Sequence, residues 1–218
     1  TAIPDVNFEQ VLIDQNIDSD GVINGQVLTS DISSLTNFNF NANNVEDFTG
    51  LEDFSALETL FMDNVNFGFN NFENEELDLS SIVNLESFTM FGGDDSQINY
   101  VSQLDLSNNF NLNNIQVPAN WYLKQIDLKT GTTDVSNLDI NIDIGFPLPP
   151  PPEGVAQSFQ NEDFCIKVTD AAAATAGQGV YATWTISAVN NPYFFSETCT
   201  LGVDEFDINS VSIYPNPT

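Results

Sequence analysis

The 218-residue, 24.0 kDa chain has 41% hydrophobic residues, 18 of them Phe, so a packed core that buries roughly 70% of the unfolded surface is expected. Its 32 acidic and 3 basic residues give a net charge of −29. The protein therefore lacks the basic surface that binding to nucleic acid requires, and its binding to anionic membranes is disfavoured. Because histidine is absent, histidine-dependent triads, histidine bases and His-bearing zinc sites are excluded, whereas chemistry by a pair of carboxylates remains open.

No run of eighteen or more apolar residues occurs, so a transmembrane helix is not expected. The chain opens on TAIPDVNF without a basic, apolar leader, as expected of a protein whose signal has been removed. Residues 6–17, VNFEQVLIDQNI, carry apolar residues at 8, 11, 12 and 13, a spacing that favours a short helix. Since a stack of repeats needs polar ends, we expect this helix to close the N-terminal end.

The twelve residues 16–27, NIDSDGVINGQV, match part of an EF-hand calcium loop. Asn16, Asp18 and Asp20 occupy positions one, three and five, a glycine stands at the sharp turn, and Ile23 occupies the position that enters a core. Position twelve, which needs a bidentate carboxylate, is Val27. We therefore interpret the stretch as a capping turn, and the alternative is a weak calcium site at Asn16, Asp18 and Asp20.

A repeat runs through the middle of the chain. Residues 77–85 and 104–112, LDLSSIVNL and LDLSNNFNL, are near-copies, and residues 126–138 form a looser third copy. An LxxLxL line follows each copy and also occurs twice earlier. These lines begin at residues 35, 57, 85, 112 and 135, with steps of 22, 28, 27 and 23 residues, which fall in the leucine-rich-repeat range.

In an LxxLxL line the last two apolar residues alternate along a short strand and point inward, and a coil buries them only by stacking on another coil. The predicted fold is a right-handed leucine-rich-repeat solenoid of about five coils, α/β horseshoe-like and mainly β, with one curved parallel sheet. The predicted divisions are a helical cap (1–34), repeats (35–145), a proline loop and C-terminal β cap (146–200) and a further segment (201–218).

The residues between the inward positions should form a concave face rich in amides and hydroxyls. Such a face, with two phenylalanines on it, suits hydrogen bonding and stacking on a sugar or peptide. The alternative is a solvated sheet face whose two aromatic side chains merely cover one another. The predicted outward residues are Asn37, Asn39, Asn41, Thr59, Phe61, Asp63, Ser87, Thr89, Phe91, Asn114, Gln116, Asn137 and Asp139.

Residues 65–76 and 91–103 lengthen two coils, either to decorate a binding edge or by neutral loop drift. Asp94 and Asp95 lie in the second insertion, where a solvated turn is favoured over a cation site. Residues 146–154, FPLPPPPEG, favour an extended polyproline segment that is either a linker or a long loop.

The two cysteines, Cys165 and Cys199, have neither CxxC spacing nor companion histidines. A single structural disulfide, and hence an oxidising compartment, is the favoured interpretation, with two buried thiols as the alternative.

The ordered combination of IPDVNFEQVLID, DGVINGQVLTSDI, NNVEDFTGLEDFSALETL, the LDLS lines and the late FCIKV and FFSETC resembles secreted leucine-rich-repeat proteins of Bacteroidota, especially flavobacteria. The end of the chain, LGVDEFDINSVSIYPNPT, is similar to the start of a type IX secretion sorting domain, with the motif at Tyr214, Pro215, Asn216 and Pro217. This resemblance implies export through the type IX machinery, its outer-membrane translocon and shuttle, to the cell surface or medium.

No catalytic constellation is found in the sequence. We therefore expect a non-enzymatic recognition or adhesion module that is secreted or cell-surface, with an extracellular protein or glycan ligand and no cofactor other than the candidate calcium. A glycan-binding accessory protein is the alternative, and a carboxylate-pair glycosidase comes third.

Overall fold

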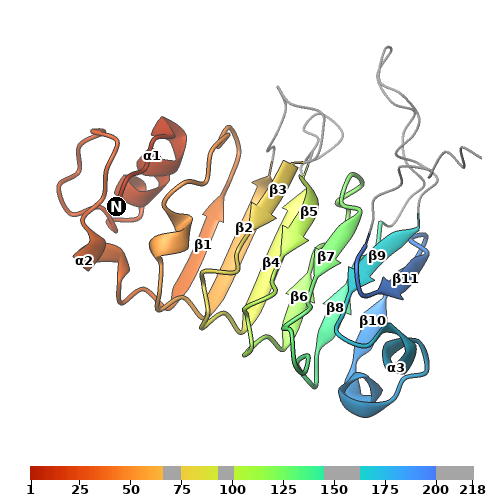
Figure 1. Ribbon diagram of the computed structural model, residues 1–218. Coiled ribbons are helices and arrows are strands. Elements are labelled where there is room, and N and C mark those ends of the chain that lie inside the picture. Colours follow the sequence, from red (N-terminus) through yellow and green to blue (C-terminus); the bar gives the residue numbers. More distant parts are fainter. Residues whose placement is uncertain (66–74, 93–100, 145–162, 200–218) are drawn as a thin grey trace, which may run out of the picture.

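The computed structural model describes residues 1–65, 75–92, 101–144 and 163–199. In these ranges the chain builds two parallel sheets, one of six strands and one of five (Figure 1). The six-stranded sheet runs in the order β1 (Asn37–Asn41), β2 (Thr59–Val65), β4 (Ser87–Gly92), β6 (Asn114–Gln116), β8 (Asp139–Asn141) and β10 (Thr185–Ser187). The five-stranded sheet runs β3 (Glu75–Asp78), β5 (Val101–Asp105), β7 (Gln125–Asp127), β9 (Phe164–Lys167) and β11 (Tyr193–Ser196).

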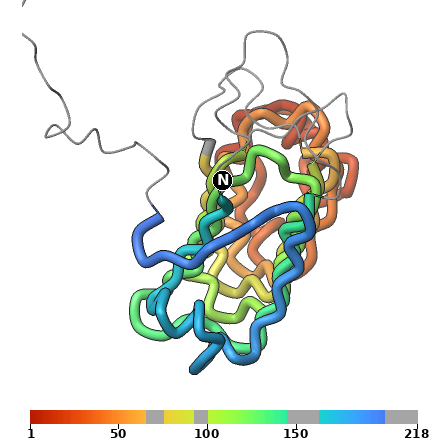
Figure 2. Tube along the Cα trace, turned by 90° about the vertical axis from the view of Figure 1, so that its right-hand side faces the viewer, coloured from red at the N-terminus to blue at the C-terminus, as the bar shows by residue number. Residues whose placement is uncertain are grey.

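From β2 onward, consecutive strands alternate between the two sheets. Viewed along the stack, the chain winds round an elongated outline with a sheet on each long side (Figure 2). This arrangement of parallel sheets, few helices and one disulfide is compatible with a solenoid-like fold. The prediction of one curved parallel sheet was wrong, because the LDLS lines form strands of a second sheet.

The second sheet follows from the same alternation that predicts the first. In LDLS, Leu77 and Leu79 are buried and Asp78 between them is exposed, which is the period of two of a strand. The Asp78 carboxylate accepts a hydrogen bond from the Ser80 amide at 2.8 Å, and the equivalent Asp105 and Asp127 accept from amides two residues later. Each aspartate therefore forms an Asx turn that ends its strand.

The core lies between the two sheets. At each inward position of the register, every strand contributes one side chain to it. Phe38, Leu60, Phe88 and Ile115 are partners along the first sheet, and each is at most 1% exposed. The corresponding partners in the second sheet are Leu77, Leu104, Ile126 and Ile166, and each is at most 4% exposed.

Asparagine side chains also link successive connections between the strands. Nδ2 of Asn109 donates to the carbonyls of Leu79 and Ile82 at 3.1 and 2.7 Å, and Nδ2 of Asn84 donates to the Ser55 carbonyl at 2.8 Å. The carbonyls of Leu79 and Ile82 also accept backbone amides within their own turn, so the Asn109 bonds add a second donor from the next turn along the chain.

The N-terminal end is covered by α1 (Val6–Asp14), as residues 6–17 predict, and a short α2 (Thr29–Ile32) follows. Asp5 caps α1 by accepting from the amides of Asn7 and Phe8. The ring of Phe8 lies 5.8 Å from Phe40 and belongs to a buried aromatic cluster with residues 38, 48 and 54. A 3-10 turn, η1 (Leu51–Asp53), lies in the connection between β1 and β2.

The C-terminal part contains α3 (Ala171–Thr175) and the 3-10 turn η3 (Gly179–Thr183), both in the connection between β9 and β10. Figure 1 places α3 beside the last strands of the stack. Asp170 caps α3 by accepting from the Ala173 amide at 2.8 Å. None of the helices in the described ranges has the length or the apolar composition needed to cross a bilayer.

Candidate functional site

The outward side chains of the six-stranded sheet form the surface that we call the polar face. Strand pairing places one outward residue of each strand beside the next in two parallel rows. The first row is Asn37, Thr59, Ser87, Asn114, Asp139 and Thr185. The second row is Asn39, Phe61, Thr89, Gln116, Asn141 and Ser187.

Part of the polar face is fixed by its own hydrogen bonds. Nδ2 of Asn114 donates to Oγ of Ser87 at 2.8 Å, and Nε2 of Gln116 donates to Oδ1 of Asn114 at 2.8 Å. These bonds hold three side chains in one orientation, so a ligand that meets them loses less side-chain entropy on binding.

Phe61 and Phe91 lie together within the polar face. Their ring centroids are 5.6 Å apart at an interplanar angle of 62°, and both side chains are half-buried. The predicted pair of aromatics is thus one apolar contact area between neighbouring strands, with Asn39 and Thr89 beside Phe61 in the row. Asn41 of β1 and Asp63 of β2 are also partners in the sheet register.

The prediction for the fifth strand was displaced by two residues. Ile140, and not Leu138, is the partner of Ile115, so the outward residues of β8 are Asp139 and Asn141. Asn137 precedes the strand at a φ of 57°, and its backbone amide donates to Oγ1 of Thr183 at 2.8 Å. Leu138, Ile140 and Ile142 are all buried and lie two residues apart, so they point to the same face. A shift of the predicted register by two residues therefore leaves the apolar pattern unchanged.

The loop that contains Asn16, Asp18 and Asp20 is built round an internal carboxylate from α1. Glu9 is 0% exposed, and its oxygens accept from the backbone amides of Asn24, Gly25 and Gln26 at 2.8 to 3.2 Å. Successive amides that point at one carboxylate form an anion-holding nest. No periodicity in the sequence predicts this contact.

The candidate calcium ligands have partners of their own in this loop. Asp20 accepts from the Val22 amide at 2.9 Å and from Nδ2 of Asn24 at 2.9 Å, and Oδ1 of Asp18 accepts from the Asp20 amide at 3.3 Å. Oδ2 of Asp18 is buried without a hydrogen-bond partner. Burial, and secondarily the nearby Asp20, Glu9 and Asp31, raises the pKa of the Asp18 carboxyl.

Ile23 is 46% exposed and Val27 is buried, so Ile23 does not enter a core as position eight of an EF-hand loop does. Asn16 sits just after α1 at a φ of 57°. Across the described residues no group of three or more His, Cys, Asp or Glu is arranged to hold a metal ion. Calcium at Asn16, Asp18 and Asp20 stays a prediction.

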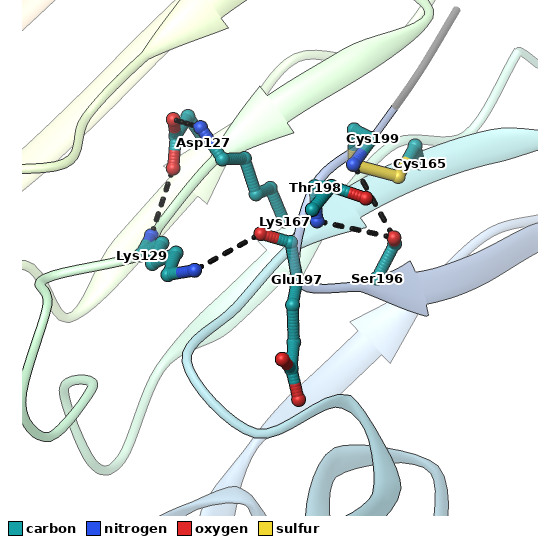
Figure 3. The surroundings of a disulfide bond; sticks show 8 residues. All are labelled: Asp127, Lys129, Cys165, Lys167, Ser196, Glu197, Thr198 and Cys199. Atoms are coloured by element: carbon teal, nitrogen blue, oxygen red, sulfur yellow. Dashed lines mark hydrogen bonds and ion pairs between the residues drawn. A yellow bond between two sulfur atoms is a disulfide. The ribbon is translucent and has the colours of Figure 1, made fainter.

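The predicted disulfide between Cys165 and Cys199 is confirmed. It joins β9 to the turn after β11, with the Cα atoms 5.9 Å apart, a usual separation for a disulfide (Figure 3). Oγ of Ser196 accepts from the amides of Thr198 and Cys199, each at 3.3 Å. A disulfide favours an oxidising compartment.

Three aspartates lie side by side on the outward face of the five-stranded sheet. Asp78, Asp105 and Asp127 are successive partners, and Lys167 completes the row as the ion-pair partner of Asp127. Burial and the three aspartates raise the pKa of Glu76. The row is explained by the Asx turns described above.

A pocket of about 230 Å³, the C-terminal pocket, lies between the α3 region and the last strand of each sheet. Four of its residues are aromatic, and Tyr193 is 38% exposed. Sequence reasoning missed it because residues from four elements converge only in three dimensions; the aromatic density of 181–184 and 193–195 was the available signal. Its lining is Ala174, Thr175, Gly177, Tyr181, Trp184, Ile186, Tyr193 and Phe195.

Several predictions fall outside the described residues. They are the sorting motif at residues 214–217, Asp94 and Asp95, and the polyproline segment 146–154. Comparison of the chain with protein-family models, with curated proteins and with solved structures finds no match.

Proposed function

We propose that the protein is a non-enzymatic recognition module of the leucine-rich-repeat solenoid type, and that it binds an extracellular protein through the polar face. The single observation that carries the proposal is the unbroken pair of side-chain rows across all six strands, made almost entirely of amides, hydroxyls and one aromatic contact. Such rows offer many hydrogen-bonding groups in a fixed spacing, which suits an extended ligand.

Two features support the solenoid assignment. The partners Phe38, Leu60, Phe88 and Ile115 keep one register although 22 to 28 residues separate them along the chain. Hydrogen bonds from asparagine side chains to carbonyls of the preceding coil recur. Asn109 donates them to Leu79 and Ile82 from a turn of the repeat, and Asn84 donates one from the closing NL of its repeat. Both features are expected of stacked repeats.

Glycan binding is the second candidate, and the Phe61–Phe91 contact favours it. An aromatic surface bordered by Asn39 and Thr89 offers stacking for a sugar ring and hydrogen bonds for its hydroxyls. A glycan array and a pull-down from the surface of the producing cell would distinguish the two ligand classes.

The test of the polar face is a double substitution, Phe61→Ala with Phe91→Ala. We expect it to weaken capture of the ligand at least tenfold, since aromatic anchors dominate interface energetics. The matched control is Phe110→Ala, because Phe110 is 55% exposed in a turn and belongs to neither row of the polar face. Unchanged capture by the folded double variant would remove the polar face from consideration.

A panel of polysaccharides tests the absence of catalysis. The proposal predicts that no polysaccharide in the panel releases reducing ends, whether or not one of them binds, whereas a carboxylate-pair glycosidase would produce them.

We also propose secretion by the type IX route, on the resemblance of residues 201–218 to a sorting-domain start. Tagged protein should reach the surface or medium of a flavobacterial host and should remain in the periplasm of a host that lacks the type IX translocon. The Cys165–Cys199 disulfide supports an oxidising destination. Equal export by both hosts would overturn the proposed route.

A further inference from the structure

Four aromatic side chains belong to the lining of the C-terminal pocket, and the polar atoms of two of them are bonded to the protein. Nε1 of Trp184 donates to the Val135 carbonyl at 2.8 Å, and the Tyr181 hydroxyl donates to Oδ2 of Asp134 at 2.6 Å. These bonds fix the orientation of the two rings, and both residues are part of the pocket lining. Tyr181 and Trp184 pack edge to face at 4.9 Å, as do Tyr193 and Phe195 at 5.6 Å.

The electrostatics of the pocket favour a positive charge. The Tyr181 hydroxyl donates a hydrogen bond to the buried carboxylate of Asp134, and this bond makes the phenol ring electron-rich. Asp170, whose amide donates to the Tyr181 hydroxyl at 3.1 Å, adds a second carboxylate nearby. Burial, followed by the bond to Asp134, raises the pKa of Tyr181 well above its usual value, so this donor stays protonated.

The protein supplies no cation of its own to the pocket. None of the three lysines is among its lining residues. Lys167 pairs with Asp127, and Nζ of Lys129 donates to the Glu197 carbonyl at 3.0 Å, on the disulfide side of β11 (Figure 3). With a net charge of −29, the molecule attracts cationic partners and repels anionic ones.

We propose that the C-terminal pocket binds the side-chain ammonium group of a lysine on a basic partner protein. The volume of about 230 Å³ is below the roughly 300–1,000 Å³ of pockets for drug-sized ligands and suits one long side chain. The lysine stem packs on Ile186 and Phe195, and the ammonium group lies against the faces of the aromatic rings. This site is separate from the polar face and does not depend on the function proposed for it.

The experiment compares two short peptides that differ at one position, Ac-Gly-Gly-Lys-Gly-Gly-NH₂ and its norleucine analogue, which keeps the apolar stem without the charge. Binding is followed by the NMR signal of the Trp184 indole N–H. Since the chain has 2 tryptophans, the other indole, on Trp121, serves as the internal reference outside the pocket lining. A salt concentration of about 0.3 M suppresses general attraction to the acidic surface.

Tyr193→Leu is the informative substitution, because Tyr193 is 38% exposed and its loss should leave the fold intact. We expect it to weaken lysine binding by about 2- to 5-fold, the effect of one cation–π contact, and Tyr193→Phe to retain binding. Phe194→Leu is the matched control, since its neighbouring position on β11 pairs with Cys165 and is not part of the lining.

The expected result is a Trp184 shift that saturates with the lysine peptide, is smaller with norleucine and is reduced only in Tyr193→Leu. Equal or tighter binding of norleucine would overturn the proposal by showing a purely apolar pocket. Equal weakening by Phe194→Leu, or the absence of any Trp184 shift at millimolar peptide, would overturn it as well.

Discussion

The two ends of the stack both gather aromatic residues, but in opposite ways. At the N-terminal end Phe8 is 0% exposed, and Phe38 and Phe54 stack at 5.4 Å within a closed cluster. At the C-terminal end Trp184 and Phe195 remain half-buried and Tyr193 is 38% exposed round a pocket. The N-terminal aromatics have a helix to cover them, whereas the C-terminal aromatics leave ring surface accessible beside α3.

The difference teaches that the two ends are stabilised by different means. The N-terminal end relies on packing and on the buried Glu9 carboxylate, and the C-terminal end relies on a covalent link between β9 and the turn after β11. A region held by a disulfide can leave apolar surface exposed for binding without losing its structure. The following substitutions test this contrast.

Phe8→Ala should have the largest effect. Removal of a fully buried ring that contacts four others should lower the free energy of unfolding by about 3–5 kcal/mol. Tyr193→Ala at the other end should cost less than about 1 kcal/mol, because that ring is partly solvated already. Urea unfolding of both variants measures the contrast, and similar costs would show that the two ends do not differ.

Removal of the disulfide by Cys165→Ser with Cys199→Ser should lower the free energy of unfolding by about 2–4 kcal/mol, because the link closes a 34-residue separation in the unfolded chain. Hydrogen exchange should increase most in β10, β11 and α3. A reducing agent should reproduce the loss in the wild type and have no effect on the double variant. Uniform exchange across both ends would contradict a local role.

Glu9→Gln should lower the free energy of unfolding by about 2 kcal/mol, since a charged acceptor of backbone amides is replaced by a neutral amide that also brings donors. Thermal unfolding at neutral pH is the measurement. Glu46→Gln, on an exposed side chain, is the control and should change little. Equal changes in the two variants would mean that the nest contributes nothing.

Asp18→Asn should have the smallest effect and the opposite sign. Because burial raises the folded-state pKa of Asp18, the ionised carboxylate destabilises the fold at neutral pH, and this penalty disappears as pH falls through the raised pKa toward 3.8. The variant should therefore be more stable than the wild type at pH 7 and should lose this advantage at low pH. Asp14→Asn, at an exposed site, controls for net charge.

The effect of calcium on stability is measured on the wild type and on Asp18→Asn. If an ion binds at Asn16, Asp18 and Asp20, millimolar calcium should raise the melting temperature of the wild type and leave Asp18→Asn unchanged. Calorimetry that detects no heat of binding would end the calcium hypothesis.

The strand lines of the first sheet were predictable because Phe38, Leu60, Phe88 and Ile115 carry a period of two within a repeat. The fifth line slipped because residues 138, 140 and 142 are all apolar and buried, so the pattern is satisfied in either register. The second sheet was not predicted, because the LDLS letters that define the repeat also alternate with the period of two of a strand.

Of the candidate sites, the first five strands of the polar face follow from alternation, and Asn141 was missed through the displaced register. Thr185 and Ser187 of β10 were not predicted to belong to this face. The Glu9 nest and the C-terminal pocket were beyond sequence reasoning for a different reason. Glu9 meets amides 15 to 17 residues away through a loop without regular structure. The pocket brings together Ala174 and Phe195 from separate elements, and no local pattern encodes such a meeting.

The disulfide also determines how mechanical load passes through the protein. A pull on the chain at Cys199 is transmitted through the sulfur bridge directly to Cys165 in β9, in the interior of a sheet that β7 and β5 continue. Residues 166–198 contain α3, β10, β11 and the whole lining of the C-terminal pocket, and they therefore lie outside this covalent path of the force. A protein tethered from this side would keep its pocket intact under tension until the strand pairing of β9 fails.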